Sequence, residues 1–318
     1  MDSCGALALQ DFGAFDSVTL KGTRLALDQL ITPGILDDPA KIASIRRQMD
    51  AAQPFAHVVV DGLFDEALLD LLAADFPGEP TGTMPDGPMM LLQSKEMRVA
   101  RSAEGAPLSA AQQVYCDLVN SGRFVRFLSQ ISGIDDLIVD HSLDGGGLHS
   151  TGDNGLFNIH CDFKYHRRTK LLNKIALITY LNRDWMPDNG GELELWDARS
   201  QSCAKRIEPV FGRCVIMIHS DRSFHGHPSP YRARGGQPRR SFASRYYINS
   251  LVPIEDSEYC ASIFLEKLGR KALTASDVDR FLSTRTWRGK ARYYARQITP
   301  PVAWSLGRRL LRRKDRTL

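Results

Sequence analysis

The stretch GLFNIHCDFKYH (residues 155–166) carries the pattern from which fold and chemistry can be worked out. It follows Gly-rich sequence and reads as a short β-strand. His160 and Asp162 are two positions apart, and residues i and i+2 of a strand point to the same face of a sheet. One imidazole and one carboxylate are therefore expected to converge on one point.

Segments of the same character surround this stretch. They are five to ten residues long, rich in β-branched and aromatic residues, and separated by Gly, Asn, Asp or Pro. Many short strands at close spacing, without βαβ alternation, predict a β-sandwich or barrel. The segments are DLIVDHSL (136–143), KIALITYLN (174–182), GELELWD (191–197), RCVIMIHS (213–220) and RRSFASRYYI (239–248).

Helical periodicity flanks this β-rich region on both sides. Residues 55–64 (FAHVVVDGLF) interrupt the first helical region as a strand, residues 79–106 are loop-like, and Asp37 or Asp38 is expected to cap the second helix. The expected helices are 25–31, 37–53, 65–76, 108–121, 122–132, 255–270 and 275–284.

A third ligand beside His160 and Asp162 would complete a two-histidine, one-carboxylate facial triad, which leaves metal positions open and favours iron(II). The segment SDRSFHGHPSP (220–230) supplies His225 and His227, and the ligand is expected to come from a strand neighbouring the first. Open positions would allow a bidentate co-substrate and O2 to bind side by side.

A dicarboxylate co-substrate needs its distal carboxylate neutralised in a buried pocket. Arginine suits this task, because its planar fork matches a carboxylate and it stays charged when desolvated. Arg239 and Ser241 share one strand face, so both could hold the same carboxylate. Arg240 is the alternative arginine.

The ordered series of residues resembles the 2-oxoglutarate/Fe(II)-dependent dioxygenase superfamily, in its prolyl-4-hydroxylase-like branch. The resemblance spans roughly 137–249 and extends more weakly to about residue 54. It implies a mainly β fold: a double-stranded β-helix (jelly-roll) core, N-terminal buttressing helices and a helical, basic C-terminal extension. The matching motifs are His160-Cys161-Asp162, Tyr180-Leu181-Asn182, Trp185, Gly190-Gly191-Glu192-Leu193, Pro209, Gly212-Arg213, His225 and Arg239-Arg240-Ser241.

The resemblance also implies roles for these residues. His160, Asp162 and His225 would be the metal and catalytic ligands, because the family places the distal histidine first in its segment. Arg239, Tyr180 and Ser241 would bind 2-oxoglutarate, with the Arg-x-Ser spacing and the aromatic residues that follow favouring Arg239 over Arg240. The implied cofactors are Fe(II), 2-oxoglutarate and O2, with ascorbate as a stimulant.

The implied reaction hydroxylates an unactivated C–H bond and yields succinate and CO2. Related halogenases lack the carboxylate ligand, so Asp162 favours hydroxylation. The expected substrate is a small molecule, biosynthetic intermediate or amino-acid-type compound, with a peptide or protein side chain as an alternative. A substrate lid is expected from residues 79–106 and 142–155, with His149 at the mouth of the site.

Two other classes compete with this interpretation. A non-enzymatic jelly-roll that binds metal or sugar would not need Arg239, Ser241 and Tyr180. A zinc hydrolase would need a general base beside the ligands. Glu192 and Glu194 lie on another strand and are expected to face loops.

Composition and charge limit the compartment, the cysteine chemistry and the domain organisation that the chain can have. The irregular spacing of six cysteines, with no CxxC pair, argues against zinc or redox motifs and fits buried thiols in a reducing cytoplasm. No secretory signal or membrane-spanning stretch is expected. We expect a lead-in over 1–53, the oxygenase domain over 54–250 and the extension over 251–318.

The C-terminal segment 285–318 is strongly basic. It has 11 Lys or Arg and one acidic residue, whereas the rest of the chain has 30 basic and 36 acidic residues. Arginines mixed with Trp, Tyr and Leu suit an anionic membrane surface, an acidic partner or the acidic body of the chain itself. Nucleic acid is not expected, because the body has no basic stripe.

Overall fold

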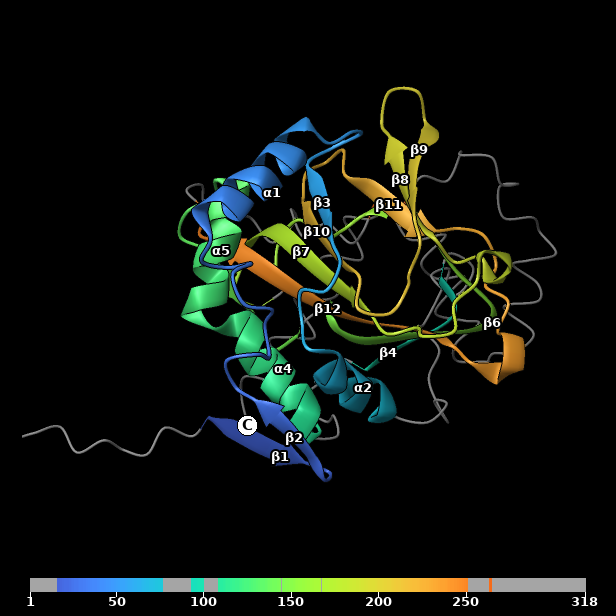
Figure 1. Cartoon of the computed structure of the whole chain (residues 1–318). Helices are drawn as coiled ribbons and strands as arrows, with labels where there is room; N and C mark the ends of the chain where they lie inside the picture. The colour runs from blue at the N-terminus through green and yellow to red at the C-terminus, as the bar shows by residue number, and fades with distance from the viewer. Residues whose placement is uncertain are drawn as a thin grey trace, which may run out of the picture.

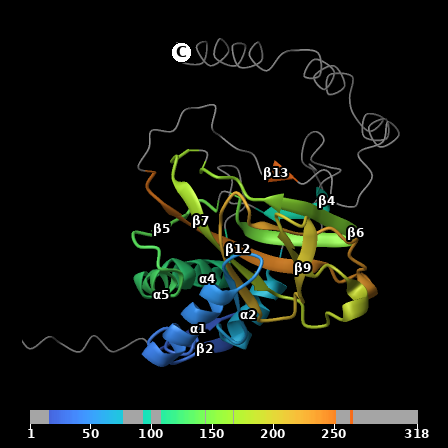
Figure 2. The same cartoon turned by 90° about the horizontal axis from the view of Figure 1, so that it is seen from above.

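A computed structural model of the chain describes residues 16–76, 93–99, 108–143, 145–166, 168–250 and 263–264. Of the strands at 93–99 and 263–264 only the backbone is described. Within these residues the protein is a curled, antiparallel, jelly-roll-like half-barrel with four α-helices on one side (Figures 1 and 2). The helices are α1 (Pro39–Ala51), α2 (Glu66–Ala74), α4 (Ala110–Asn120) and α5 (Gly122–Ser132).

The main sheet runs in the order β3-β10-β7-β12-β6-β11-β8-β9, with β4 and β13 also paired to β6 and β5 paired to β12. All of these pairs are antiparallel. The strands are β3 (His57–Val60), β4 (Gln93–Val99), β5 (Ile138–Val139), β6 (Gly147–Cys161), β7 (Leu172–Tyr180), β8 (Leu193–Asp197), β9 (Ser202–Ile207), β10 (Cys214–Ile218), β11 (Phe224–His227), β12 (Arg239–Ile248) and β13 (Ile263–Phe264).

The long strand β6 joins the two parts of the half-barrel. Its first part, 147–151, pairs with β12, and its later part pairs with β11 through His160 and Phe157. One strand therefore borders both parts, and the sheet curls around the face to which His160 points. Figure 1 shows this curl, with β8, β9 and β11 on one side and β7 and β12 on the other.

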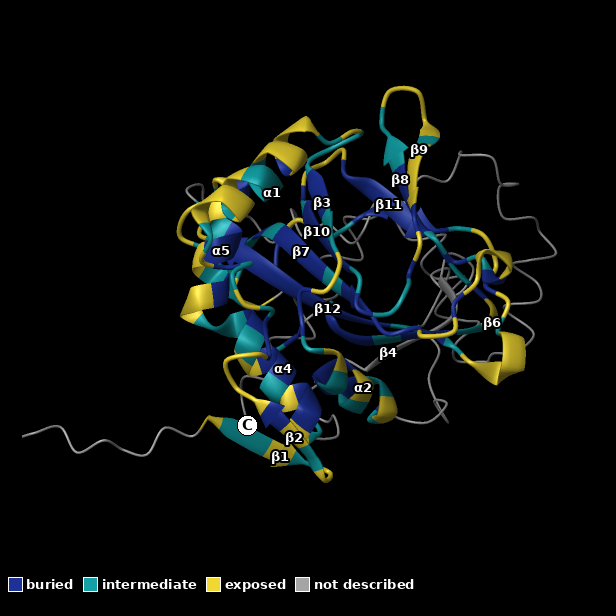
Figure 3. Cartoon of the chain, in the orientation of Figure 1, coloured by how far each residue is buried: buried dark blue, intermediate teal, exposed yellow. Residues whose placement is uncertain are grey.

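Side-chain alternation separates the two faces of the sheet. On β7, Ile175 and Leu177 join the core against α4 and α5, whereas Ala176 and Tyr180 belong to a second apolar cluster inside the curl. Figure 3 shows buried residues along these strands and exposed residues on the outer helix faces. The helices thus cover one face and leave the other for a site.

Several predictions from the pattern are confirmed. Helix α1 begins after Asp38, whose carboxylate accepts hydrogen bonds from the backbone N–H groups of Ala40 and Lys41, so Asp38 and not Asp37 is the cap. Helices α2, α4 and α5 lie within 65–76, 108–121 and 122–132 as expected.

The helix expected at 25–31 is wrong. Strands β1 (Ser17–Leu20) and β2 (Thr23–Ala26) form a hairpin instead. Lys21 and Gly22 both have positive φ, 50° and 84°, as a tight two-residue hairpin turn requires. Leu25 and Leu30 then pack against Leu68 of α2, so their spacing reflected a local core and not a helical face.

The expectation of irregular loops at 79–106 and 142–155 is also wrong in part. Residues 93–99 form β4, whose polar sequence QSKEMRV lacks the usual apolar signal, and 147–155 are the first part of β6. His149 therefore lies on a strand. Within the helix expected at 255–270, Ile263–Phe264 form a strand that pairs with Cys161 and His160, so that prediction is wrong for these two residues.

The rest of the expected C-terminal extension, including the basic segment 285–318, lies outside the described residues, so its role and the three-part division of the chain remain predictions. Among the residues that the structure does describe, no helix is long and apolar enough to cross a membrane.

Candidate metal centre and co-substrate pocket

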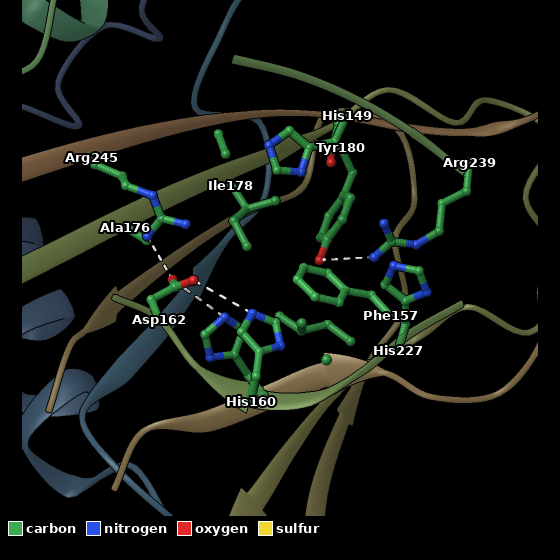
Figure 4. Close-up of a pocket in the computed structure, with 15 residues that line it drawn as sticks. His149, Phe157, His160, Asp162, Ala176, Ile178, Tyr180, His227, Arg239 and Arg245 are labelled. Carbon is green, nitrogen blue, oxygen red and sulfur yellow. Dashed lines mark hydrogen bonds and ion pairs between the residues drawn. The ribbon is translucent and has the colours of Figure 1, made fainter. Parts of the chain in front are cut away.

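Two neighbouring strands bring the predicted triad together. His225 of β11 is the direct partner of His160 of β6, and Asp162 follows two residues after His160. One ligand atom from each of the three residues lies within 4.8 Å of the others. His227 is separated from His225 by a shift in strand register and is not part of this group. The grouping predicted from the sequence is confirmed (Figure 4).

Backbone carbonyls orient both imidazoles. His160 Nδ1 lies 2.8 Å from the carbonyl oxygen of Asn158, and His225 Nδ1 lies 2.9 Å from that of Ser223. A carbonyl oxygen only accepts, so each Nδ1 carries the proton and each Nε2 has a lone pair. The two Nε2 atoms lie 3.5 and 3.6 Å from oxygens of Asp162.

This arrangement fits a cation. Two imidazole Nε2 atoms and a carboxylate converge on one point, and this donor set suits a bound positive ion. Burial is the main cause that lowers the pKa of His225 to about 4, which keeps its imidazole neutral at pH 7. Burial is the largest influence on the pKa of Asp162 and would raise it, but the charge of Arg245 and the neighbouring His160, His219 and His225 together outweigh burial and hold this pKa well below its usual range.

The triad lies in a cavity with an empty volume of about 530 Å³, which includes the open solvent at its mouth. The wall combines apolar and cationic side chains from β6, β7, β8, β11 and β12, and the Phe157 ring stacks on His160 with centroids 4.0 Å apart. The lining residues are His149, Phe157, His160, Asp162, Ala176, Ile178, Tyr180, Leu193, His225, Gly226, His227, Arg239, Ser241, Ala243 and Arg245.

Arg239 lies at the end of this pocket away from Arg245, beside Tyr180 (Figure 4). Its guanidinium is buried, Nε donates to the carbonyl of Gly191 at 2.7 Å, and Nη2 is 3.4 Å from the Tyr180 hydroxyl. Ser241 is the cross-strand partner of Tyr180. Burial raises the pKa of Tyr180 although Arg239 opposes it, so the phenol stays protonated and can donate.

Arg240 points to the opposite face of β12, as strand alternation requires. Its Nη1 donates to the carbonyl of Ala73 at 3.2 Å, and its guanidinium lies over the Phe76 ring. It does not line the pocket. Of the two arginines that the sequence left open, only Arg239 reaches the cavity with Tyr180 and Ser241.

The Gly-Gly segment before β8 has a geometric reason. Gly191 has φ 74°, a conformation that disfavours other residues. A Cβ there would lie 3.0 Å from Arg239 Cδ and 3.0 Å from the Tyr231 ring. Glycine thus lets the backbone approach Arg239 closely enough to accept its hydrogen bond.

Glu194 does not face a loop, contrary to the sequence-based expectation. It is buried and accepts hydrogen bonds from Trp196 Nε1 and Arg206 Nε at 2.8 and 3.2 Å. The cavity wall contains neither Glu192 nor Glu194. Within the described residues, therefore, no glutamate is placed to serve a metal-bound water as a hydrolase would require.

Two residues at the site escaped the sequence analysis. Arg245 Nη1 donates to Asp162 Oδ2 at 2.6 Å, and His219 Nε2 lies 3.2 Å from the same oxygen. The sequence did indicate Arg245, because it lies an even number of residues from Arg239 and Ser241 on one strand and so shares their face. No sequence pattern indicated His219, since it follows β10 and reaches Asp162 only through the curl of the sheet.

Comparison with known proteins agrees with this site. Residues 146–249 match the family described as the 2OG-Fe(II) oxygenase superfamily. No curated protein is similar enough in sequence to count as a relative. The matched residues contain the whole triad, so this domain is that of a 2OG-Fe(II) oxygenase, an enzyme that uses Fe(II) and 2-oxoglutarate.

Solved structures with a similar fold are distant. A prolyl-4-hydroxylase from Pseudomonas putida is 15% identical with a TM-score of 0.45, covering 66% of this chain and 100% of its own. HygX from Streptomyces hygroscopicus, with nickel and 2-oxoglutarate bound, is 13% identical with a TM-score of 0.41, covering 65% of this chain and 91% of its own. These similarities are too low to indicate a substrate.

Proposed function

We propose that this oxygenase hydroxylates an unactivated C–H bond of a small molecule, a biosynthetic intermediate or an amino-acid-type substrate, with conversion of 2-oxoglutarate to succinate and CO2. The observation that carries the proposal is the convergence of a complete triad and a buried Arg239–Tyr180 pair on one cavity. The half-barrel would then be the double-stranded β-helix core inferred from the sequence.

Each residue has a distinct task in this proposal. His160, Asp162 and His225 hold Fe(II) through Nε2 and carboxylate atoms, with both imidazoles oriented by backbone carbonyls. Arg239, with Tyr180 and Ser241, binds the distal carboxylate of 2-oxoglutarate. The bound iron and 2-oxoglutarate supply the O2-dependent oxidation, while the protein orients both and limits access of water.

The carboxylate ligand favours hydroxylation over halogenation. Asp162 is buried with its charge compensated by Arg245, so a negatively charged ligand is already built into the site. A halide would need that position. We therefore propose that the product is hydroxylated and not halogenated.

The main alternative is a non-enzymatic module that binds metal or sugar. It gives no reason to bury a guanidinium whose neighbours are Tyr180 and the Gly191 carbonyl, because burying a charge without a ligand is costly. A hydroxylase of protein side chains is the second alternative.

The test is anaerobic addition of Fe(II) and then 2-oxoglutarate to purified protein. A weak visible charge-transfer band that disappears on admission of O2, with succinate formed, is expected. The matched control is Arg240→Met, which removes an arginine of the same strand outside the cavity and should keep the band. A protein that binds Fe(II) but gives no band with 2-oxoglutarate would favour the binding module.

We further propose a cytoplasmic protein whose basic segment 285–318 contacts an anionic membrane surface or an acidic partner. The support is its charge, eleven basic residues against one acidic residue. Co-sedimentation with vesicles containing phosphatidylserine, compared with neutral vesicles and with a chain ending at residue 284, tests the membrane interaction.

A further inference from the structure

The two arginines of the cavity differ in how their charges are balanced. Arg239 contacts neutral partners, the Gly191 carbonyl and the Tyr180 hydroxyl, and its charge is assigned above to the distal carboxylate of 2-oxoglutarate. Arg245 lies at the other end of the cavity, beside Asp162 (Figure 4). Its Nη1 donates to Asp162 Oδ2 at 2.6 Å, so its charge is balanced by the same carboxylate that would bind the metal.

One wall of the cavity consists of three cross-strand pairs between β12 and β7. The first pair is polar and lies at the Arg239 end, the second is apolar, and the third contains Arg245. In this order the pairs are Ser241 with Tyr180, Ala243 with Ile178, and Arg245 with Ala176, and all six residues line the cavity. Only the methyl groups of Ala243 and Ala176 stand beside Arg245 on this wall, so they leave room for a ligand.

One terminal nitrogen of Arg245 is not used by the surrounding protein. Nε donates to the Gly145 carbonyl at 2.9 Å, and Nη1 contacts Asp162 and lies 3.2 Å from His219 Nε2. The guanidinium stands over the Phe163 ring at 5.1 Å. Nη2 makes no hydrogen bond within the part of the chain that the structure describes. Because Arg245 lines the cavity, a ligand there can accept from Nη2.

The charges of the loaded cavity do not cancel. Fe(II), Arg239 and Arg245 bring four positive charges, because an arginine stays charged when it is buried. Asp162 and the two carboxylates of 2-oxoglutarate bring three negative charges, and the described cavity wall contains no other acidic residue. Any histidine that took up a proton would only add positive charge. One positive charge is left over, and it lies at the Arg245 end, because Arg239 has the distal carboxylate as its partner.

An acidic residue outside the cavity does not provide the missing partner. Burial would lower the pKa of Arg245, but Asp162 and, more weakly, Tyr247 and Asp140 outweigh burial and raise this pKa. Asp140 does not line the cavity, and its Oδ1 accepts from the hydroxyl and the backbone N–H of Ser142 at 2.5 and 2.8 Å. It therefore acts on Arg245 through space and leaves the cavity side of the guanidinium open.

We propose that Arg245 is a substrate-binding residue and that the substrate has a carboxylate that pairs with Arg245 Nη2. This inference rests on the proposed function, because the charge count takes iron and 2-oxoglutarate as bound. A buried charge without a partner is costly, whereas a guanidinium and a carboxylate form charge-assisted hydrogen bonds. A single surplus charge matches a single carboxylate, which narrows the proposed substrates to small monocarboxylates, including those of amino-acid type.

The test uses butanoate and butanamide, two probes of similar shape that differ in charge. Each is titrated into the full-length protein loaded anaerobically with Fe(II) and saturating 2-oxoglutarate, and binding is followed by the visible band and by calorimetry. We expect butanoate to bind at least about tenfold more tightly than butanamide, as one hydrogen bond between charged groups provides. Arg245→Met should remove this preference, and Arg245→Lys, which keeps a cationic donor, should retain part of it.

Arg240→Met is the matched control, since it removes another arginine of β12 whose side chain lies on the opposite face, and it should keep the preference. Equal binding of the two probes to the wild type, or an unchanged preference in Arg245→Met, would overturn the proposal. Displacement of 2-oxoglutarate by butanoate would also overturn it, because the probe would then occupy the site at Arg239.

A crystal structure of the wild type covers the case in which Arg245→Met does not fold. In the protein loaded with Ni(II), 2-oxoglutarate and butanoate, the probe carboxylate is expected within hydrogen-bond distance of Arg245 Nη2. A carboxylate bound elsewhere would refute the role of Arg245 while leaving the proposed function intact. Absence of the visible band from the wild type with Fe(II) and 2-oxoglutarate would instead refute the proposed function itself.

Discussion

Replacing Arg239 by methionine tests the co-substrate pocket. Methionine keeps much of the side-chain volume and removes the charge and all five N–H donors. Arg239 is 5% exposed, and Gly191 and Tyr180 occupy only Nε and one side of the guanidinium. Its other N–H groups have no partner among the residues that the structure describes, and we expect them to bind a carboxylate.

The expected loss follows from these contacts. Two charge-assisted hydrogen bonds at the lower end of their usual value amount to about 3 kcal/mol, which corresponds to a roughly 150-fold rise in the Kd for 2-oxoglutarate. Fe(II) binding should change little, because Arg239 is not a ligand. The assay is titration of 2-oxoglutarate into the anaerobic Fe(II) protein, followed by the visible band.

Arg240→Met is the control and should leave the Kd near that of the wild type. Its guanidinium contacts the Ala73 carbonyl and Phe76 on the far face of β12, so a modest loss of stability is its expected effect. If Arg239→Met bound 2-oxoglutarate as the wild type does, while Arg240→Met bound it weakly, the assignment of the two arginines would have to be exchanged.

The other predictions concern the metal and the fold. Asp162→Ala should abolish turnover and weaken Fe(II) binding, measured by calorimetry under anaerobic conditions; unchanged activity would remove Asp162 from the triad. Burial is the main cause that lowers the pKa values of His225 and His219 to about 4 and about 3. As pH falls, these histidines therefore take up protons in the unfolded chain before they do so in the folded protein. The free energy of unfolding of the metal-free protein should therefore decrease as pH falls from about 6.5 to 4, by up to roughly 1.4 kcal/mol per pH unit for each histidine. Equal urea midpoints at pH 7 and pH 5 would contradict this prediction. Gly226→Ala would place a Cβ 2.7 Å from the Asn158 carbonyl oxygen. It should therefore lower the free energy of unfolding by about 1–3 kcal/mol, measured by urea denaturation, and weaken Co(II) binding. Wild-type values for both quantities would show that β11 and β6 can separate there.

Local pattern was sufficient where the chemistry lies within one strand. His160 and Asp162 converge because two residues of a strand share a face, and this needs no knowledge of the fold. The helices α1, α2, α4 and α5 likewise follow from apolar spacing and caps such as Asp38. Where the signal was short or polar, as at 25–31 and 93–99, pairing with a neighbouring strand decided the structure instead.

The sequence by itself thus determined the class of fold, the metal ligands His160 and Asp162 and the superfamily, because the ordered motifs along β6 to β12 are local. Only the tertiary structure showed that His225 joins the metal group and that Arg239, and not Arg240, lines the cavity, since register and strand face depend on pairing. Only it placed Arg245 and His219 on Asp162. These residues are 83 and 57 positions from Asp162, and the curl of the sheet that joins them arises from long-range strand pairing that no short sequence window contains.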